Sequence, residues 1–398
     1  MKINRFLISV LVLLILSLLF SCTKDEKLIT EPETMEIFDL SYSNSILTWK
    51  SSESTRSIVQ YSTDSDFLNH TAYSIQGETT NHSIIFLDLN SDTTYYYRIK
   101  QKTADTIIYS SIKKFNSGAV SAPAQILKVV YIDVKQGDSE LIKTPEGNVV
   151  LIDGGYGSYG AESWTGFGQK ITLNYLKSES ITSINYLILT HPHADHVGGL
   201  ADVLSDSSIT KVDYVYDNML SSTSEAYIDF LNAITPRSET NYALPELGSF
   251  ISLDSDQVKM KLIHNKNQMD EDDTGHYYND CSLTYHLEFK NFKAMFQGDA
   301  ETVAQDVILS NYPNDIRSQF YKVGHHGSYN GTSRAWMEKM RPVACYIPCG
   351  AGNPYGHPHN QTLTILEDFN VDIYRADQNG TVILLTDGEN NFTIIREK

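Results

Sequence analysis

The chain has 398 residues, a formal net charge of −18 at pH 7, and 41% hydrophobic and 11% aromatic residues. This composition excludes an intrinsically disordered chain, and the length gives room for about two or three domains. The acidic excess excludes tight, sequence-tolerant nucleic-acid binding through a basic face, so a phosphate-bearing substrate has to be attracted locally.

The N-terminus is predicted to be a targeting segment. Residues 1–21 begin with two basic side chains and continue as an apolar run over 6–20, which is short for a membrane span. Cys22 follows directly, and this arrangement resembles the lipobox of bacterial lipoproteins. We therefore predict a signal peptide, a lipidated Cys22, a tether over 22–33, and an exported protein anchored to the outer membrane or cell surface. An ordinary secretory signal cleaved elsewhere is the alternative.

Residues 34–116 are predicted to form a small all-β sandwich, because short runs of alternating apolar residues recur about every ten residues. Tyr95 follows a polar loop and resembles the corner tyrosine of fibronectin type III domains, with Trp49 as the core indole. The resemblance implies a spacer or a docking domain for glycan or protein. Residues 117–125, rich in small side chains, are predicted to be a linker.

Residues 126–398 are predicted to form a layered α/β domain, because apolar runs alternate with amphipathic segments. The predicted strands cover residues 127–134, 139–144, 148–153, 186–189, 285–289 and 293–296. The predicted helices cover residues 169–176, 224–234 and 300–309.

The densest group of metal-binding side chains follows the predicted strand at 186–189. His191 and His193 are two residues apart at the end of that strand and therefore project to the same side. The next turn enters a helix and can fold Asp195 and His196 over a second ion. The pattern H-x-H-x-D-H thus predicts two adjacent metal positions, and a histidine-rich surface loop is the alternative.

Residues 126–398 resemble the metallo-β-lactamase fold, and most closely the hydrolase domain of ComEC-type DNA-uptake proteins and the related phosphorylcholine esterases. Seven motifs carry the resemblance in chain order: residues 133–139, 151–155, 189–199, 279–283, 296–300, 323–328 and 353–358. The resemblance implies an αββα sandwich, preceded here by the small all-β domain. Lys135, where the family has glycine, departs from the pattern in the first turn.

The resemblance also implies a ligand set for two Zn²⁺ ions, with Mn²⁺ as the alternative metal. The ligands are His191, His193 and Asp280 for the first ion, Asp195, His196 and His326 for the second ion, and Asp299 as the bridge. Asp280 stands where metallo-β-lactamases proper have a histidine, and His276 and Cys281 are alternatives at that position.

Three further residues are predicted to act on the substrate. His325 orients a neighbour or contacts substrate, and either it or His326 closes the second site, with His326 favoured. His357 is predicted to protonate a leaving oxygen or to stabilise phosphoryl charge, the alternative being a structural loop histidine. Lys322 is predicted to contact the phosphodiester, the alternative being a solvated lysine.

Other residues are predicted to support or border the site. Asp138 and Asp153 are interpreted as partners of imidazole N–H groups. The glycine-rich loop over 154–168 either borders the site or is pinned to the domain by its aromatic side chains, and both readings stay open. Those side chains are Tyr156, Tyr159, Trp164 and Phe167.

These features predict an exported binuclear metal-dependent hydrolase, a phosphodiesterase or nuclease that uses a metal-bridging hydroxide. The predicted substrate is DNA or a phosphorylated envelope or choline-type phosphoester. An acyl or β-lactam hydrolase is one alternative, which Asp280 disfavours. A catalytically inert surface-binding module is another, which the complete ligand set disfavours.

Overall fold

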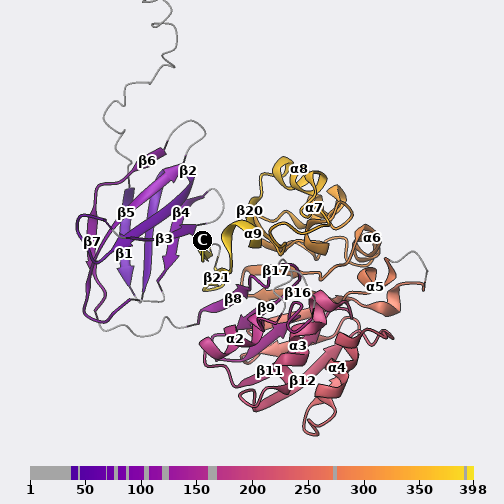
Figure 1. The fold of residues 1–398 in the computed structure, drawn as a ribbon. Coiled ribbons are helices and arrows are strands. Elements are labelled where there is room, and N and C mark those ends of the chain that lie inside the picture. The colour runs from indigo at the N-terminus through magenta and orange to yellow at the C-terminus, as the bar shows by residue number, and fades with distance from the viewer. Residues whose placement is uncertain are drawn as a thin grey trace, which may run out of the picture.

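The computed structural model describes residues 37–398 except 44, 69, 76–78, 87–88, 103–106, 119–124, 160–167, 272–275 and 390–391. The predicted signal peptide, the tether and Cys22 lie outside the described residues, as do Trp164 and Phe167. A small β domain lies beside a larger α/β domain (Figure 1). Among the described helices, none has the length and apolar character needed to cross a membrane.

The N-terminal domain is all-β, as its alternating runs predict, and it is built around β2 (Ile46–Ser62). The first half of β2 pairs with β1 (Ile37–Ser43) and β4 (Thr79–Ile85), while its second half pairs with two other strands. β2 thereby belongs to both sheets of this domain, one with β1 and β4 and the other with β3 (Thr71–Ile75) and β5 (Thr94–Lys102). The remaining strands are β6 (Ile107–Tyr109) and β7 (Lys113–Asn116).

Aromatic side chains fill the core of this domain. Trp49 is fully buried, and its ring stacks on His82 with centroids 5.0 Å apart. The buried Tyr95 accepts the Asn90 backbone N–H on its hydroxyl at 2.8 Å. Both residues singled out from the sequence therefore have packing roles.

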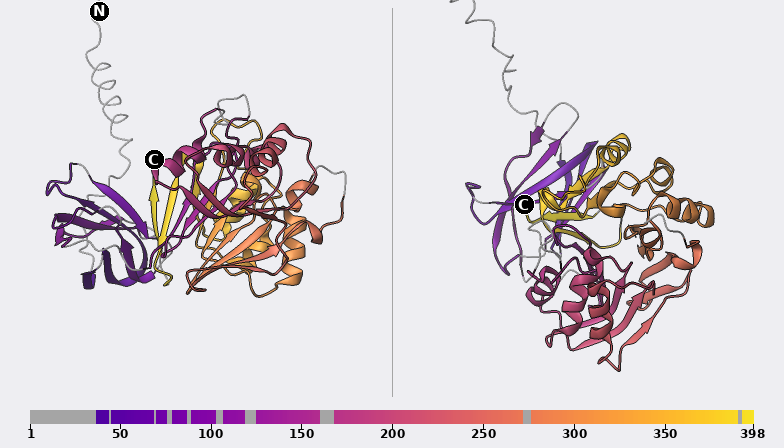
Figure 2. Two further views of the ribbon diagram at one scale, coloured as in Figure 1. Left: turned by 90° about the horizontal axis from the view of Figure 1, so that it is seen from below. Right: turned by 45° about the vertical axis from the view of Figure 1, so that its right-hand side comes forward.

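The second domain consists of two sheets packed face to face, with helices on both outer sides (Figures 1 and 2). One sheet contains β8 (Leu127–Tyr131), β9 (Glu140–Lys143), β10 (Val149–Ile152), β11 (Ser183–Leu189), β12 (Lys211–Asp217), β13 (Asn241–Ala243), β21 (Val382–Thr386) and β22 (Thr393–Arg396). The other contains β14 (Phe250–Leu253), β15 (Val258–His264), β16 (Thr284–Phe289), β17 (Phe292–Phe296), β18 (Phe320–Lys322), β19 (Ala344–Ile347) and β20 (Asp372–Arg375).

The helices complete an αββα sandwich, which confirms the predicted fold class. Those that cover the first sheet are α2 (Ile171–Ser178), α3 (Ala194–Ser205) and α4 (Glu225–Ile234). The later ones are α5 (Tyr277–Asp280), α6 (Thr302–Asn311), α7 (Arg334–Met340), α8 (Asn360–Asp368) and α9 (Ala376–Asn379), with short 3-10 turns η2 (Lys266–Gln268) and η3 (Gly324–Gly327). The strands and helices predicted from sequence are all present, with shifted ends.

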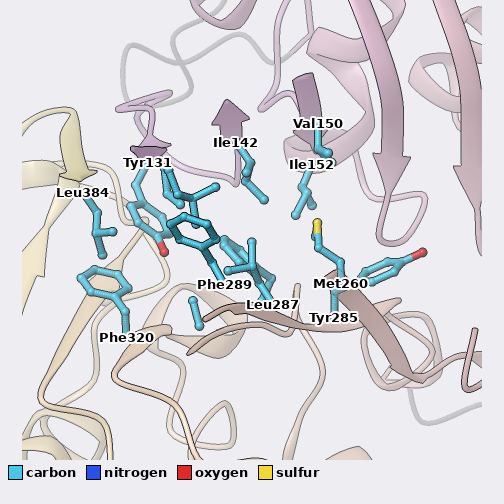
Figure 3. Packing of buried hydrophobic residues seen from close by; sticks show 14 of the residues in the cluster. Tyr131, Ile142, Val150, Ile152, Met260, Tyr285, Leu287, Phe289, Phe320 and Leu384 are labelled. Atoms are coloured by element: carbon cyan, nitrogen blue, oxygen red, sulfur yellow. The ribbon is translucent and has the colours of Figure 1, made fainter. Parts of the chain in front are cut away.

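Between the sheets lies an apolar core whose side chains come from both (Figure 3). Tyr131 stacks on Phe320 with ring centroids 4.9 Å apart, and both are fully buried. Truncating such a ring to alanine typically costs about 3–5 kcal/mol of stability. This core holds the two sheets in a fixed relation and therefore fixes the loops at their ends.

Parallel pairing determines where the functional loops meet. The pairs β10–β11 and β11–β12 in one sheet, and β17–β18 and β18–β19 in the other, are parallel. The carboxyl ends of parallel strands lie at one edge of a sheet, where ligands usually bind. The loops after β11, β17, β18 and β19 carry the histidine and aspartate motifs, so the fold brings them together.

The two domains are joined directly by strand pairing. β22 pairs with β21 and also, through Thr393 and Ile394, with β3 of the N-terminal domain. The Thr393 hydroxyl accepts the Ile85 backbone N–H at 3.1 Å, and Arg56 forms an ion pair with Asp372. The C-terminal strands consequently lie between the two domains (Figure 2). Most of the predicted linker lies outside the described residues.

Candidate metal centre

The loop between β11 and α3 presents the first group of ligands. His193 occupies the N-cap position of α3, and Asp195 and His196 lie in its first turn. The helix can approach the loop after β10 only because Gly199 has no side chain: a Cβ there would lie 1.9 Å from the Gly154 carbonyl oxygen.

His196 is held by Asp153. The Asp153 carboxylate contacts His196 Nδ1 at 2.7 Å and accepts the Thr190 N–H at 2.8 Å. The other ring nitrogen, Nε2, lies 3.2 Å from Asp299 Oδ2 and has no hydrogen-bond partner among the described residues. A carboxylate behind one imidazole nitrogen fixes the ring so that the other can bind a metal.

His326 is held in the same way by Asp138. Its Nδ1 lies 3.2 Å from Asp138 Oδ1, while its Nε2 lies 3.1 Å from Asp195 Oδ2 and 3.2 Å from Asp299 Oδ2. The backbone of His326 has φ +53°, a left-handed conformation that turns the side chain inward. Asp138 and Asp153 therefore have the predicted orienting positions.

Four buried side chains offer ligand atoms within 4.8 Å of one another: Asp138, His196, Asp299 and His326. Because Asp138 already contacts Lys322 and His326 Nδ1, we assign it an orienting role. Asp195 lies on the other side of His326 and completes the group. His196 Nε2, His326 Nε2 and Asp299 Oδ1 are buried without a hydrogen-bond partner, a condition that fits a bound cation.

The electrostatics of this group also favour a cation. Burial opposes a charge on His196 and His326, but Asp299 and the neighbouring carboxylates outweigh it and hold the pKa of both imidazoles well above the ordinary value. Burial likewise opposes ionisation of Asp299, but the two imidazoles hold its pKa well below the usual range. A divalent ion would replace the imidazole protons at the same nitrogen atoms.

The first predicted position lies beside the second. His191 Nε2 is 3.8 Å from Asp299 Oδ2 and 3.0 Å from His193 Nδ1. His191 Nδ1 faces the hydroxyls of Thr190, at 3.1 Å, and Ser282, at 3.3 Å. Asp299 is thus adjacent to both positions, which fits a bridging role.

Asp280 lies elsewhere, which corrects its predicted position as a ligand. Its Oδ1 accepts the backbone N–H groups of Glu301 at 3.0 Å and Ala304 at 3.4 Å, so it caps the start of α6. Burial raises the pKa of this carboxyl to about 6. The alternatives are also outside the cluster: His276 Nδ1 contacts Glu301 at 2.9 Å, and Cys281 is buried beside α5. In this motif the Ser282 hydroxyl contacts His191 Nδ1 at 3.3 Å and accepts the Asp299 backbone N–H at 3.1 Å.

Lys322 is also placed differently from the prediction. Its side chain is 1% exposed, and its ammonium group pairs with Asp138 and donates to the Gly298 carbonyl at 2.7 Å. Burial opposes the charge on Lys322, but Asp138 and Asp299 raise its pKa, so the lysine stays charged. Lys322 therefore neutralises Asp138 inside the domain and does not reach a substrate.

Glu301 is a buried site residue that sequence reasoning missed. Its carboxylate contacts the Nδ1 atoms of His325 and His276, each at 2.9 Å, and accepts Asn279 Nδ2 at 3.0 Å. His325 is 23% exposed, and its Nε2 lies 3.9 Å from Asp299 Oδ2. The only sequence signal was the position of Glu301 two residues after Asp299.

His357 lies next to the cluster. Its ring centroid is 5.5 Å from that of His325 and 6.1 Å from that of His326, and Asn353 holds its backbone through two hydrogen bonds. Burial and the neighbouring histidines lower its pKa to about 3. The ring is then neutral at neutral pH, which favours charge stabilisation over proton donation.

Two tyrosines border the site. Tyr355 is 51% exposed, its ring lies 5.6 Å from that of His357, and its side chain hydrogen-bonds Tyr156. Tyr159, by contrast, packs against the core under α3 and reaches Asp229 with its hydroxyl. In the glycine-rich loop introduced above, Tyr156 thus borders the site and Tyr159 pins the loop to the domain.

Two family models match the chain. Residues 132–336 match the model described as Metallo-beta-lactamase superfamily, and residues 39–117 match the one described as Purple acid Phosphatase, N-terminal domain. The second match covers the all-β domain, for which the fibronectin type III assignment stays a prediction.

Among known proteins, the chain is 27% identical over 263 residues to ComE operon protein 3 of Bacillus subtilis (strain 168), covering 64% of this chain and 32% of that protein. It is 25% identical over 85 residues to competence protein ComA of Neisseria gonorrhoeae, covering 21% and 12% respectively. The chain thus spans a third or less of these relatives.

Solved structures with similarity include CmlA, a diiron beta-hydroxylase from Streptomyces venezuelae, with TM-score 0.41 and 12% identity over 65% of this chain and 54% of that one. A diphosphatase from the PhnP family has TM-score 0.38 and 15% identity, covering 64% and 96%.

Proposed function

The chain belongs to the metallo-beta-lactamase superfamily, and we propose that within it this protein is an exported, binuclear metal-dependent phosphodiesterase. The observation that carries the proposal is the convergence of His196 Nε2 and His326 Nε2 on Asp299 Oδ2, each at 3.2 Å. His191 approaches the same carboxylate from the neighbouring position.

Two divalent ions in such a site lower the pKa of water to about 7 and neutralise charge that develops on an oxyanion. In this proposal His191, His193 and Asp299 hold the first ion, and Asp195, His196, His326 and Asp299 hold the second. Zn²⁺ is proposed as the metal because imidazole and carboxylate together suit it, and Mn²⁺ is the alternative.

The other side chains of the site have orienting and substrate-facing roles. Asp153 and Asp138 fix the rings of His196 and His326, and Lys322 balances the charge of Asp138. His357 and His325 lie next to the cluster and are proposed to contact a phosphoryl oxygen. This places hydrogen-bond donors where negative charge increases during attack on phosphorus.

The bordering tyrosines support an organic phosphodiester as substrate. The exposed ring of Tyr355 offers a flat face that can stack on a nucleobase or contact a choline group. DNA is the first candidate because the resemblance is to DNA-uptake hydrolase domains and one curated relative is named a competence protein. A phosphorylated envelope or choline-type phosphoester is the second candidate.

Export and lipid anchoring through Cys22 are part of the proposal and rest on the sequence of residues 1–22. Replacing Cys22 with serine should abolish lipid labelling and release the protein in soluble form, because serine lacks the thiol that carries the proposed lipid anchor. Unchanged membrane association of Cys22→Ser would contradict the lipobox assignment.

One preparation tests the reaction class. The metal-loaded protein is offered bis-p-nitrophenyl phosphate, p-nitrophenyl phosphorylcholine, linear DNA and nitrocefin in parallel. We expect turnover of at least one phosphodiester and none of nitrocefin. Turnover of nitrocefin alone would identify an acyl hydrolase, and turnover of nothing by a fully metal-loaded protein would favour an inert binding module.

A further inference from the structure

We propose that a cavity at the junction of the two domains binds a small organic phosphate. The cavity has a volume of about 450 Å³, within the range of about 300–1,000 Å³ typical of small-molecule sites. It is lined by residues of β2, β3, β5 and β6 from one domain and of β20 and β22 from the other. This site is separate from the metal centre and does not depend on the proposed hydrolase activity.

The cavity concentrates positive charge in an acidic protein. Arg56, Lys100 and Arg396 line it together with one carboxylate, Asp372, while the chain as a whole carries −18. Asp372 pairs with Arg56, and among the described residues no ion pair involves Lys100 or Arg396. Three cations beside one carboxylate leave an excess of positive charge, so an anion in the cavity would stabilise them.

Strand register explains why these side chains meet. Lys100 and Ser74 both lie opposite Ile58 in the sheet, and Arg56 is two residues before Ile58, so all share one face. β22 continues this sheet by pairing with β3, which brings Arg396 of the other domain to the same face.

Arg56 is engaged by protein groups, because it pairs with Asp372 and its Nη2 donates to the Asn370 carbonyl at 3.2 Å and to the Asn370 side-chain oxygen at 3.3 Å. Arg396 and Lys100 are therefore the cations left for a ligand. Guanidinium groups match phosphate oxygens with paired N–H donors, and Lys100 supplies a point charge beside them. Ser74, which lies opposite Ile58 on the same face, also lines the cavity, and its hydroxyl suits the same oxygens.

The remaining wall is apolar, which indicates an organic body on the ligand. Ile58, Ile373 and Tyr374 line the cavity, and Ile107 is 51% exposed although it is apolar. A ligand with a phosphate head and an apolar or aromatic body would satisfy both walls. Because it would contact both domains, its binding would also stabilise their docked arrangement.

The test is calorimetric titration of the full chain with phenylphosphonate, which has a dianionic head, an aromatic body and no hydrolysable ester. The double variant Lys100→Gln/Arg396→Gln removes two cations from the cavity. The matched control Lys50→Gln/Lys211→Gln removes two exposed lysines from elsewhere on the surface. We expect the cavity variant to bind about tenfold or more weakly, as loss of charged hydrogen bonds predicts, and the control to bind like the parent.

The metal centre can also bind a phosphonate, so the titration is repeated with His326→Ala. This variant should retain the cavity site, and adding the two cavity substitutions to it should remove the remaining binding. Equal affinity of His326→Ala with and without the two cavity substitutions, or the absence of any saturable site in His326→Ala, would overturn the proposal while leaving the hydrolase assignment intact.

Discussion

The two domains both bury histidines, but they surround them with opposite groups. In the N-terminal domain, His82 lies against Trp49 and two serine hydroxyls, and burial lowers its pKa to about 4. In the α/β domain, His196 and His326 are equally buried, yet adjacent carboxylates hold their pKa well above the ordinary value. Burial alone produces a neutral structural histidine, whereas burial beside converging carboxylates produces a cation site.

The largest effect is expected for a histidine that is buried beside converging carboxylates. Replacing His326 with alanine removes a proposed metal ligand that lies beside Asp299 and Asp195. The protein should therefore lose bound metal and phosphodiesterase activity together. Metal analysis of the purified variant and turnover of bis-p-nitrophenyl phosphate measure both. The exposed His70 of the N-terminal domain provides the matched control, His70→Ala, which should keep full metal and activity. Full metal content in His326→Ala would reverse the assignment of this loop.

A smaller loss is expected at His357, which lies next to the cluster without joining it. His357→Ala should lower kcat by about 10²–10⁴, the usual effect of losing a positioned acid or charge stabiliser. Metal content and thermal stability should match the parent. If this variant lost metal while His326→Ala retained it, the two loops would have exchanged roles.

Glu301 should have a still smaller effect, because it acts through His325. Removing such an orienting carboxylate typically costs about 10–100-fold in activity or metal affinity. We expect Glu301→Ala to lower kcat within that range with little change in KM, and Glu301→Gln, which retains one acceptor oxygen, to recover part of the loss. Equal kcat values for both variants and the parent would show that the Glu301–His325 contact has no part in turnover.

The N-terminal domain should respond to substitution in stability alone. Trp49→Ala removes a buried indole and should destabilise this domain by about 3–5 kcal/mol. Hydrogen exchange in β2 and β4 reports that loss, while kcat of the folded protein should stay at the parent value. A matching fall in kcat would mean that the small domain takes part in the reaction.

The smallest expected effect is a pH dependence of the stability of the N-terminal domain. Because the pKa of His82 is about 4 when folded and about 6.5 when unfolded, unfolding takes up a proton between these values. The stabilising contribution of the neutral His82 side chain is therefore complete above about pH 6.5 and is lost as the pH falls towards 4. Hydrogen exchange in β2 and β4 should accelerate over this window, and less so in His82→Gln. An identical pH dependence in the variant would assign the effect to other groups.

The sequence could predict the course of the chain through the site better than the direction of individual side chains. The motif from His191 to His196 is contiguous, so its strand-to-helix geometry could be predicted from spacing, and its side chains stay the proposed ligands. Asp280 and Lys322 were assigned by their place in a motif, but the structure turns one onto the start of α6 and buries the other against Asp138. A motif gives the position of a residue along the chain, whereas the direction of its side chain depends on distant packing.

The domain junction shows the same limit on a larger scale. The composition of residues 117–125 predicted a linker, and nothing local indicated that β22 would pair with β3 more than three hundred residues earlier in the chain. Such pairing depends on register between segments far apart in sequence. Glu301 was missed for a related reason, because its partners His276 and His325 come from separate loops.

The proposed two-metal hydrolytic centre is built from carboxylates that converge with buried imidazoles. Its most direct test is to remove metal from the purified protein and add Zn²⁺ back in steps, measuring bound metal and bis-p-nitrophenyl phosphate turnover on the same samples. We predict binding of about two ions per chain, with activity restored as the sites fill. Full phosphodiesterase activity of the metal-free protein would contradict a two-metal hydrolytic centre.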